Sequence, residues 1–203
     1  MMSHDNPIDF YFEFSSPYGY IASQVAEPLE RRIDRKLRWR PILLGPIFKV
    51  TGQAPLTSVP LKGDYAKRDF SRTARMHQVE YRHPDRFPIG TVAACRAFYA
   101  LDERDPDAAR RLAMALYRAY FTANRDIGEA AGMLQVAQEA GLDAKALGAA
   151  IEDPRIKERV KAEVDGAIAA GVFGSPFFIA DGEPFWGVDR IPMLEDWVRK
   201  GGW

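Results

Sequence analysis

Two serines and a proline lie where the sequence changes from a strand pattern to a helix pattern. Alternating phenylalanines predict a strand over residues 8–14, and Ser15, Ser16 and Pro17 follow it directly. Serine is a preferred N-cap, and proline suits the first turn of a helix, where its missing N–H costs nothing. The free N–H groups of a helix N-terminus also stabilise anions. A serine at this corner therefore either caps the helix or takes part in chemistry, and capping alone is the more common role.

A second candidate for chemistry is the turn Gly174-Ser175-Pro176, which directly precedes an apolar segment. Proline cannot donate a hydrogen bond to a neighbouring strand, so at the start of a strand it often forms a turn. We expect the bond between Ser175 and Pro176 to be cis. The turn either simply starts a strand or presents its backbone to a ligand.

Composition narrows the classes of function. The 203 residues include 28 basic and 28 acidic side chains, which gives no global field for nucleic acid or an anionic membrane. No apolar run approaches the length of a membrane span, and the N-terminus has no pattern of a secretion signal. A single cysteine excludes an intramolecular disulfide and fits a reducing cytoplasm. His4, His77 and His83 are too scattered to predict a metal site.

The elements that would position the serine corner begin with a strand, a helix and a second strand. Alternating apolar residues predict strands over residues 8–14 and 36–44, and apolar residues at four-residue steps predict a helix over about 17–36. Helical connections of this kind usually join parallel strands. Residues 44–63 are rich in glycine and proline and predict a long loop, which in a compact domain is often functional.

Residues 64–170 predict helices almost throughout. One of these helices would bury a single face that is made by Val92, Cys95 and Phe98. Cys95 is then expected to be a buried, inert thiol, with a role in oxidation sensing as the alternative.

The pattern returns to strands near the C-terminus. Residues 175–187 predict a hairpin that turns at Asp181 and Gly182. A last helix follows, for which Asp189 is a suitable N-cap and Gly201 a suitable end.

This order of elements predicts an α/β protein with a thioredoxin-like fold and an all-helical domain inserted in its middle. We expect residues 1–45 and 171–203 to form the thioredoxin-like domain, with the inserted loop and helices spanning residues 46–170. Alternating strands and helices alone would allow several α/β folds. The serine corner and the Gly-Ser-Pro turn favour this one.

Three segments resemble the glutathione-dependent 2-hydroxychromene-2-carboxylate isomerases, which are relatives of kappa-class glutathione transferases and of disulfide oxidoreductases. These segments read DFYFEFSSPYGYIAS, RPILLGPIFKVTG and VFGSPFFIADGEPFWGVDRIPMLEDWV. Disulfide oxidoreductases have Cys-Pro-x-Cys at the corner, where this chain has Ser16, Pro17, Tyr18 and Gly19. Both redox cysteines are absent, so dithiol exchange by this chain is excluded.

The resemblance implies glutathione as cofactor and Ser16 as the catalytic residue, which would lower the pKa of the glutathione thiol. It favours capping by Ser15 and chemistry at Ser16. The residues that it implies for binding glutathione are Ser16, Pro17, Tyr18, Gln53, Ser175, Pro176, Trp186, Gly187, Val188 and Asp189. Gln53 departs from the family, which has asparagine there: it keeps the amide but is one methylene longer.

Residues of the long loop are candidates for binding the substrate. Phe48 would contact an aromatic ring, and Lys49 and Lys62 would meet carboxylates of the substrate or of glutathione. The two lysines serve equally well as solvated surface residues. Tyr65, Tyr81 and Phe87 are further candidates for an aromatic wall, although each also suits an ordinary core.

The resemblance therefore implies a cytoplasmic enzyme of aromatic compound catabolism that acts on a small aromatic carboxylate, as a homodimer. It would convert 2-hydroxychromene-2-carboxylate to trans-o-hydroxybenzylidenepyruvate by reversible addition of the glutathione thiolate. A kappa-type transferase, which conjugates glutathione to an electrophile, would use the same Ser16. A non-catalytic thioredoxin-fold module is the third possibility and predicts no affinity for glutathione.

Overall fold

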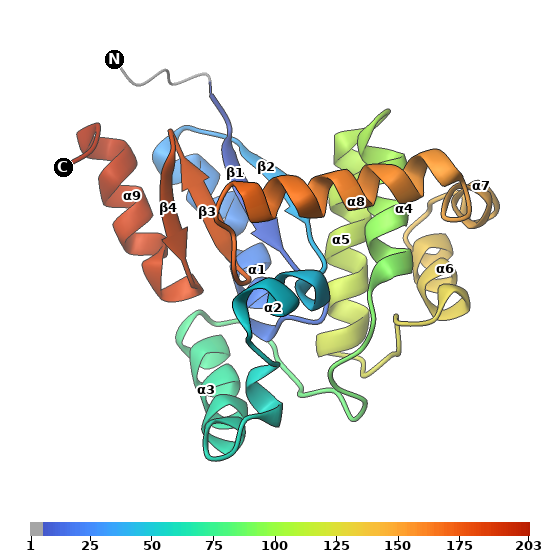
Figure 1. The fold of residues 1–203 in the computed structure, drawn as a ribbon, viewed down its shortest axis with the longest axis horizontal. Coiled ribbons are helices and arrows are strands. Elements are labelled where there is room, and N and C mark those ends of the chain that lie inside the picture. The colour runs from blue at the N-terminus through green and yellow to red at the C-terminus, as the bar shows by residue number, and fades with distance from the viewer. Residues whose placement is uncertain (1–5) are drawn as a thin grey trace.

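The computed structural model describes residues 6–203 as an α/β protein built around one four-stranded sheet (Figure 1). The strands are β1 (Ile8–Phe12), β2 (Leu37–Pro41), β3 (Phe177–Ala180) and β4 (Glu183–Trp186), in the spatial order β2-β1-β3-β4. β1 pairs parallel with β2, while β3 pairs antiparallel with both β1 and β4. This topology is the thioredoxin-like arrangement that the sequence predicts.

Both faces of the sheet are covered. Successive side chains of a strand point to opposite faces, and those of β1 are buried in two different clusters. Phe10 and Phe12 are buried in the main core with residues of α1 (Pro17–Ile33). Tyr11 is buried in a second cluster, where it packs with residues of α8 (Pro154–Ala169). In Figure 1, α8 crosses in front of the strands and α1 lies behind them.

The inserted part is helical, as predicted, but the expected loop over residues 44–63 contains a helix. Leu44–Thr51 form α2, and Leu56–Ser58 form a short 3₁₀ turn. Pro46 lies in the first turn of α2, where helix geometry requires no N–H donor, so the proline does not break the helix. The remaining helices of the insert are α3 (Lys62–Met76), α4 (Val92–Asp102), α5 (Pro106–Phe121), α6 (Ala130–Glu139), α7 (Ala144–Ala150) and α8.

The predicted buried face of α4 is only partly correct. Cys95 and Phe98 are buried, but Val92 is 41% exposed. Val92 is the first residue of α4, where the chain has just entered the helix, and its side chain faces a cavity and not the core.

The C-terminal hairpin turns at Asp181 and Gly182, both with positive φ, as predicted. The prediction that Asp189 caps the last helix is wrong. A 3₁₀ turn over Val188–Arg190 intervenes, so that Arg190 precedes α9 (Ile191–Lys200) and Asp189 pairs with Arg190 at 2.7 Å. Gly201 ends α9 in the left-handed conformation, as expected. None of the helices described here is both long and apolar enough to span a bilayer.

Candidate functional site

Ser16 is the N-cap of α1. Its backbone is extended, with φ −89° and ψ 116°, and its Oγ accepts the N–H of Gly19 at 3.0 Å. The expected capping by Ser15 is therefore wrong: the Oγ of Ser15 instead accepts the N–H of Ile89 at 3.2 Å. The cap is the residue directly before the first helical one, and the helix begins at Pro17. Capping and any chemistry at this corner thus fall on the same side chain.

The two candidate turns of the sequence meet at Ser16. Its hydroxyl donates to the carbonyl oxygen of Ser175 at 3.1 Å, across 159 residues of sequence. The Ser175–Pro176 bond is cis, as predicted. The Oγ of Ser175 accepts the N–H of Glu13 at 3.0 Å, so the turn is held to the end of β1 at two points.

Gly19 lies where disulfide oxidoreductases have the second redox cysteine, and a side chain there would have to displace its neighbours. A Cβ at this position would lie 2.7 Å from Oγ of Ser175 and 2.8 Å from the hydroxyl oxygen of Tyr117. Both distances are shorter than side-chain carbons allow. The packing around the corner therefore depends on glycine.

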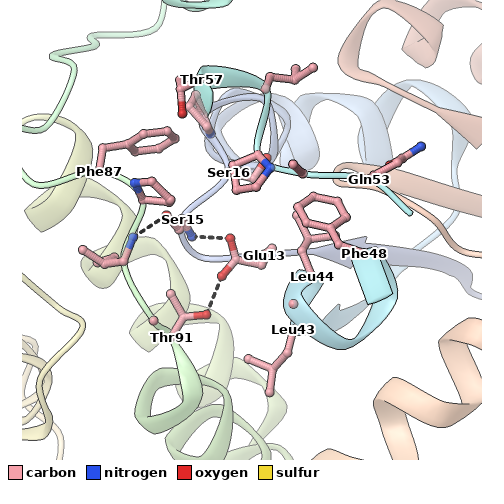
Figure 2. Close-up of a pocket in the computed structure, with 18 of the residues that line it drawn as sticks. Glu13, Ser15, Ser16, Leu43, Leu44, Phe48, Gln53, Thr57, Phe87 and Thr91 are labelled. Atoms are coloured by element: carbon pink, nitrogen blue, oxygen red, sulfur yellow. Dashed lines mark hydrogen bonds between the residues drawn. The ribbon is translucent and has the colours of Figure 1, made fainter. Parts of the chain in front are cut away.

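A cavity of about 650 Å³ opens beside Ser16 (Figure 2). Its walls come from the end of β1, from α2, from α3 and from two connecting segments, and most of them are apolar. They are formed by Glu13, Ser15, Ser16, Pro17, residues 43–46, Phe48, residues 53–57, Phe70 and residues 87–92. Figure 2 shows Phe48 and Phe87 on opposite sides of the space. Among the described residues, no lysine, arginine or histidine lines the cavity, and Glu13 is the one ionisable residue that does.

The carboxyl group of Glu13 is buried in the wall of this cavity, with the residue only 7% exposed. One of its oxygens accepts the N–H of Ser15 at 2.8 Å, and the other accepts the hydroxyl of Thr91. Burial raises the pKa of Glu13 to about 7, although both hydrogen bonds oppose the rise. Sequence reasoning missed this residue. One feature of the sequence could have indicated it: Glu13 is a lone acid between Phe12 and Phe14, at the end of an otherwise apolar strand.

The structure brings only some of the predicted site residues to the cavity. Pro17, Phe48 and Gln53 line it together with Ser16. Lys49 and Lys62 are exposed and are not among the lining residues. Of the further aromatic candidates, Phe87 lines the cavity, whereas Tyr65 is exposed and Tyr81 stacks on Phe121.

The other predicted residues lie beside the start of α1. The hydroxyl of Tyr18 donates to Asp69 at 2.5 Å. Burial and this hydrogen bond raise the pKa of Tyr18 well above its usual range, and the nearby charge of Asp189 adds to the effect. Trp186 is 52% exposed and packs on Phe173, while Val188 is buried. These residues form a rim next to the corner and do not line the cavity.

Cys95 is fully buried on α4, as predicted, and its Sγ lies 3.8 Å from the carbonyl oxygen of Ile42. Burial raises the pKa of the thiol well above its usual value, which keeps it protonated and unreactive. Within residues 6–203, no three His, Cys, Asp or Glu side chains are grouped to hold a metal ion. His4 lies outside the described residues.

These features define a thioredoxin-like protein: the order of the strands, the inserted helices and the cis-proline turn opposite the start of α1. Ser16 takes the place of the first redox cysteine. A family model of the DsbA-like thioredoxin domain matches residues 7–199. The chain belongs to this family.

Two relatives that share sequence with this chain have the names of enzymes. The chain is 31% identical over 195 residues to a 2-hydroxychromene-2-carboxylate isomerase of Sphingobium xenophagum, covering 94% of this chain and 97% of that protein. It is 27% identical over 199 residues to glutathione S-transferase kappa 1 of Rattus norvegicus, covering 92% and 88% respectively. A solved structure of a 2-hydroxychromene-2-carboxylate isomerase superposes with a TM-score of 0.86 at 24% identity, covering 96% of this chain and 95% of that one. The last comparison establishes the fold.

Proposed function

We propose that this protein is a glutathione-dependent enzyme that acts on an electrophilic double bond at Ser16. The observation that carries the proposal is the position of the Ser16 hydroxyl. It lies at the N-terminus of α1, on the wall of an apolar cavity, and donates to the carbonyl of Ser175. The names of the two sequence relatives, an isomerase and a glutathione transferase, support this reading.

The residues at the corner fit a bound thiolate. Helix geometry leaves the N–H of Tyr18 without an acceptor inside α1, and the helix dipole favours negative charge at this end. The Ser16 hydroxyl can turn from the Ser175 carbonyl toward an anion. Glutathione would supply the nucleophilic thiolate, which the chain itself cannot supply because its only cysteine is buried.

Binding of glutathione is assigned to residues around the same corner. Ser16, Pro17, Tyr18 and Gln53 would hold it on the side of the cavity. The turn of Ser175 and Pro176 would pair with its backbone, as in β-strand addition. The rim of Trp186, Gly187, Val188 and Asp189 would bind its γ-glutamyl end, and the Asp189 carboxylate is exposed and suited to an ammonium group.

The reaction we propose to test first converts 2-hydroxychromene-2-carboxylate to trans-o-hydroxybenzylidenepyruvate, a step in aromatic compound catabolism in the cytoplasm. Rotation about a carbon–carbon double bond is blocked until that bond becomes single, which addition and later departure of a nucleophile achieve. Ser16 would stabilise the negative charge of the nucleophile on arrival and departure. Phe48 and Phe87, which line opposite sides of the cavity, suit an aromatic ring.

A kappa-type transferase is the second candidate, and one observation favours it. In the part of the chain that the structure describes, no cationic side chain lines the cavity, and the single ionisable lining residue is an acid. A substrate carboxylate therefore finds no charged partner in these walls, whereas an uncharged electrophile needs none.

The first experiment follows the absorbance of 2-hydroxychromene-2-carboxylate with the purified protein, with and without glutathione. We expect conversion only with glutathione, and a loss of about 100-fold in kcat/KM for Ser16→Ala, as for removal of one donor to a reacting anion. Ser23→Ala is the matched control. It also removes a buried hydroxyl of α1, one that donates to the Tyr20 carbonyl at 2.6 Å and lies outside the cavity.

The outcomes separate the candidates. Conjugation of glutathione to 1-chloro-2,4-dinitrobenzene without isomerisation would identify a transferase. The absence of glutathione binding by calorimetry would overturn both enzymes and leave a non-catalytic module.

A further inference from the structure

The carboxyl group of Glu13 differs from the other buried glutamate of the described chain in having no cationic partner. Glu30 is also buried, and Arg110 pairs with it at 2.9 Å. None of the ion pairs formed among residues 6–203 includes Glu13. A buried carboxylate without a cation is costly. A structural role for Glu13 therefore explains its presence poorly, since a neutral side chain would avoid this cost.

Its surroundings are polar but uncharged. The N–H of Ser15 and the hydroxyl of Thr91 donate to the carboxyl oxygens. The hydroxyl of Tyr117, on α5, donates to the backbone carbonyl of Glu13 at 2.9 Å. Cys95 on α4 and Tyr120 on α5 lie near enough for the charge of Glu13 to raise their pKa values. Burial raises the pKa of each of these three groups above its usual value, so all stay neutral near neutral pH. Glu13 is thus the group in this cluster that exchanges a proton near neutrality.

The carboxyl group is also placed to meet a substrate. Glu13 lines the same cavity as Ser16, and Figure 2 shows its carboxyl between Ser15 and Thr91. Among residues 6–203, no other ionisable side chain lines the cavity, so Glu13 is the described side chain there that can gain or lose a proton near neutral pH.

We propose that Glu13 is the acid–base residue of this site, and that its carboxyl exchanges a proton with the carbonyl oxygen of a conjugated substrate. The inference rests on the proposed function and assigns to that reaction a proton donor that Ser16 cannot provide. When a nucleophile adds to the double bond of such a substrate, an electron pair moves to the carbonyl oxygen. The O–H bond of Glu13 breaks as the new O–H bond forms on that oxygen.

The proton count balances in both candidate reactions. In an isomerisation, Glu13 takes the proton back as the nucleophile leaves, so no proton is gained or lost. In a conjugation, the proton passes on to the α-carbon of the product, and Glu13 recovers one from the solvent, which has taken up the proton that the thiol lost on forming the thiolate. In both cases the acid form of Glu13 is the active one at the addition step, which requires a pKa close to the working pH.

Direct titration of the carboxyl group provides a test that needs no turnover. We expect the infrared band of a protonated carboxylic acid to disappear near pH 7 in the free wild-type protein, and to be missing in Glu13→Gln. The amide suits this place, because its oxygen accepts from Ser15 and its NH₂ donates to Thr91. Removing the Thr91 hydrogen bond in Thr91→Val should move the midpoint to higher pH, because that bond lowers the pKa of Glu13.

Kinetics of the glutathione-dependent reaction complete the test. We expect Glu13→Gln to lower kcat by about 100-fold, the usual contribution of a general acid, with unchanged glutathione affinity. Thr91→Val should keep Glu13 and move the alkaline limb of the pH profile upward. Glu158→Gln, which removes an exposed acid of α8, should change neither.

Each outcome bears on a different claim. A wild-type protein without any glutathione-dependent turnover overturns the proposed function, and this inference with it. An active wild type whose Glu13→Gln variant keeps its kcat and its alkaline limb overturns this inference alone. If Glu13→Gln does not fold, Thr91→Val decides, and an unshifted alkaline limb in that variant contradicts the role of Glu13.

Discussion

At the scale of single residues, the burial of Glu13 links protonation to folding. The pKa of its carboxyl is about 7 in the folded protein, against a usual 4.5, because burial disfavours the charged form. Between these two pH values the unfolded chain has released this proton and the folded chain still holds it. Glu13 therefore lowers the free energy of unfolding as pH rises through that range, and costs nothing below it.

We predict that Glu13→Gln removes this cost. Relative to wild type, the variant should gain roughly 3 kcal/mol in free energy of unfolding between pH 4.5 and pH 8, since each pKa unit corresponds to about 1.4 kcal/mol. Urea unfolding of both proteins at several pH values measures the difference. A difference that stays constant with pH would show that Glu13 ionises as easily in the folded protein as in the unfolded chain.

At the scale of elements, the start of α1 depends on one position without a side chain. Gly19→Ala would place a methyl group against Ser175 and Tyr117, at distances under 3 Å. Alanine favours a helix over glycine by up to about 1 kcal/mol, but overpacking of this kind costs about 1–3 kcal/mol. We therefore predict a net destabilisation for Gly19→Ala, measured by denaturant unfolding.

Gly166→Ala is the matched control for that prediction. Gly166 also lies inside a helix, α8, but a Cβ there has no atom within 4 Å. This variant should be stabilised by up to about 1 kcal/mol through helix propensity alone. Equal effects of the two substitutions would mean that the contacts of Gly19 relax at no cost.

Periodicity predicted most of the elements because apolar spacing reports directly on which face is buried. Alternation identified the strands, and four-residue steps identified α1 and the helices of the insert. α2 was missed because Gly45 and Pro46 look like loop residues, although proline is harmless in a first turn. Asp189 was misjudged as a cap because the 3₁₀ turn that separates it from α9 has no pattern of its own in the sequence.

The candidate site was harder to predict than the fold. Ser16 and the Ser175-Pro176 turn were identifiable because each is a local motif next to a strand. The cavity was not, since its walls come from segments between residues 13 and 92 that only the tertiary structure brings together. Glu13 was missed for the same reason: its environment depends on Thr91, far along the chain.

At the scale of the whole molecule, the cavity lies where the two proposed units meet. Residues 13–17 belong to the proposed thioredoxin-like domain, while Phe48, Phe70 and residues 87–92 belong to the proposed insert of residues 46–170. A ligand at Ser16 would contact both units. Because it binds only the folded arrangement, it would stabilise the entire chain.

We predict that glutathione at about 100 times its Kd raises the free energy of unfolding by about 2.7 kcal/mol, which corresponds to roughly 5–10 °C in Tm for a chain of this size. S-methylglutathione, which cannot form a thiolate, should give a smaller shift at the same concentration. Differential scanning calorimetry measures both. Equal shifts for the two ligands would contradict a site that prefers the thiolate.

Because Cys95 is completely buried, the native protein should not react with maleimides or other thiol-directed labels. A cysteine introduced on the surface would consequently be a unique attachment point, with no need to replace the native thiol. In a variant that keeps Trp186 as its only tryptophan, energy transfer from this half-exposed side chain to a dye on α3 would report changes in the distance across the binding region.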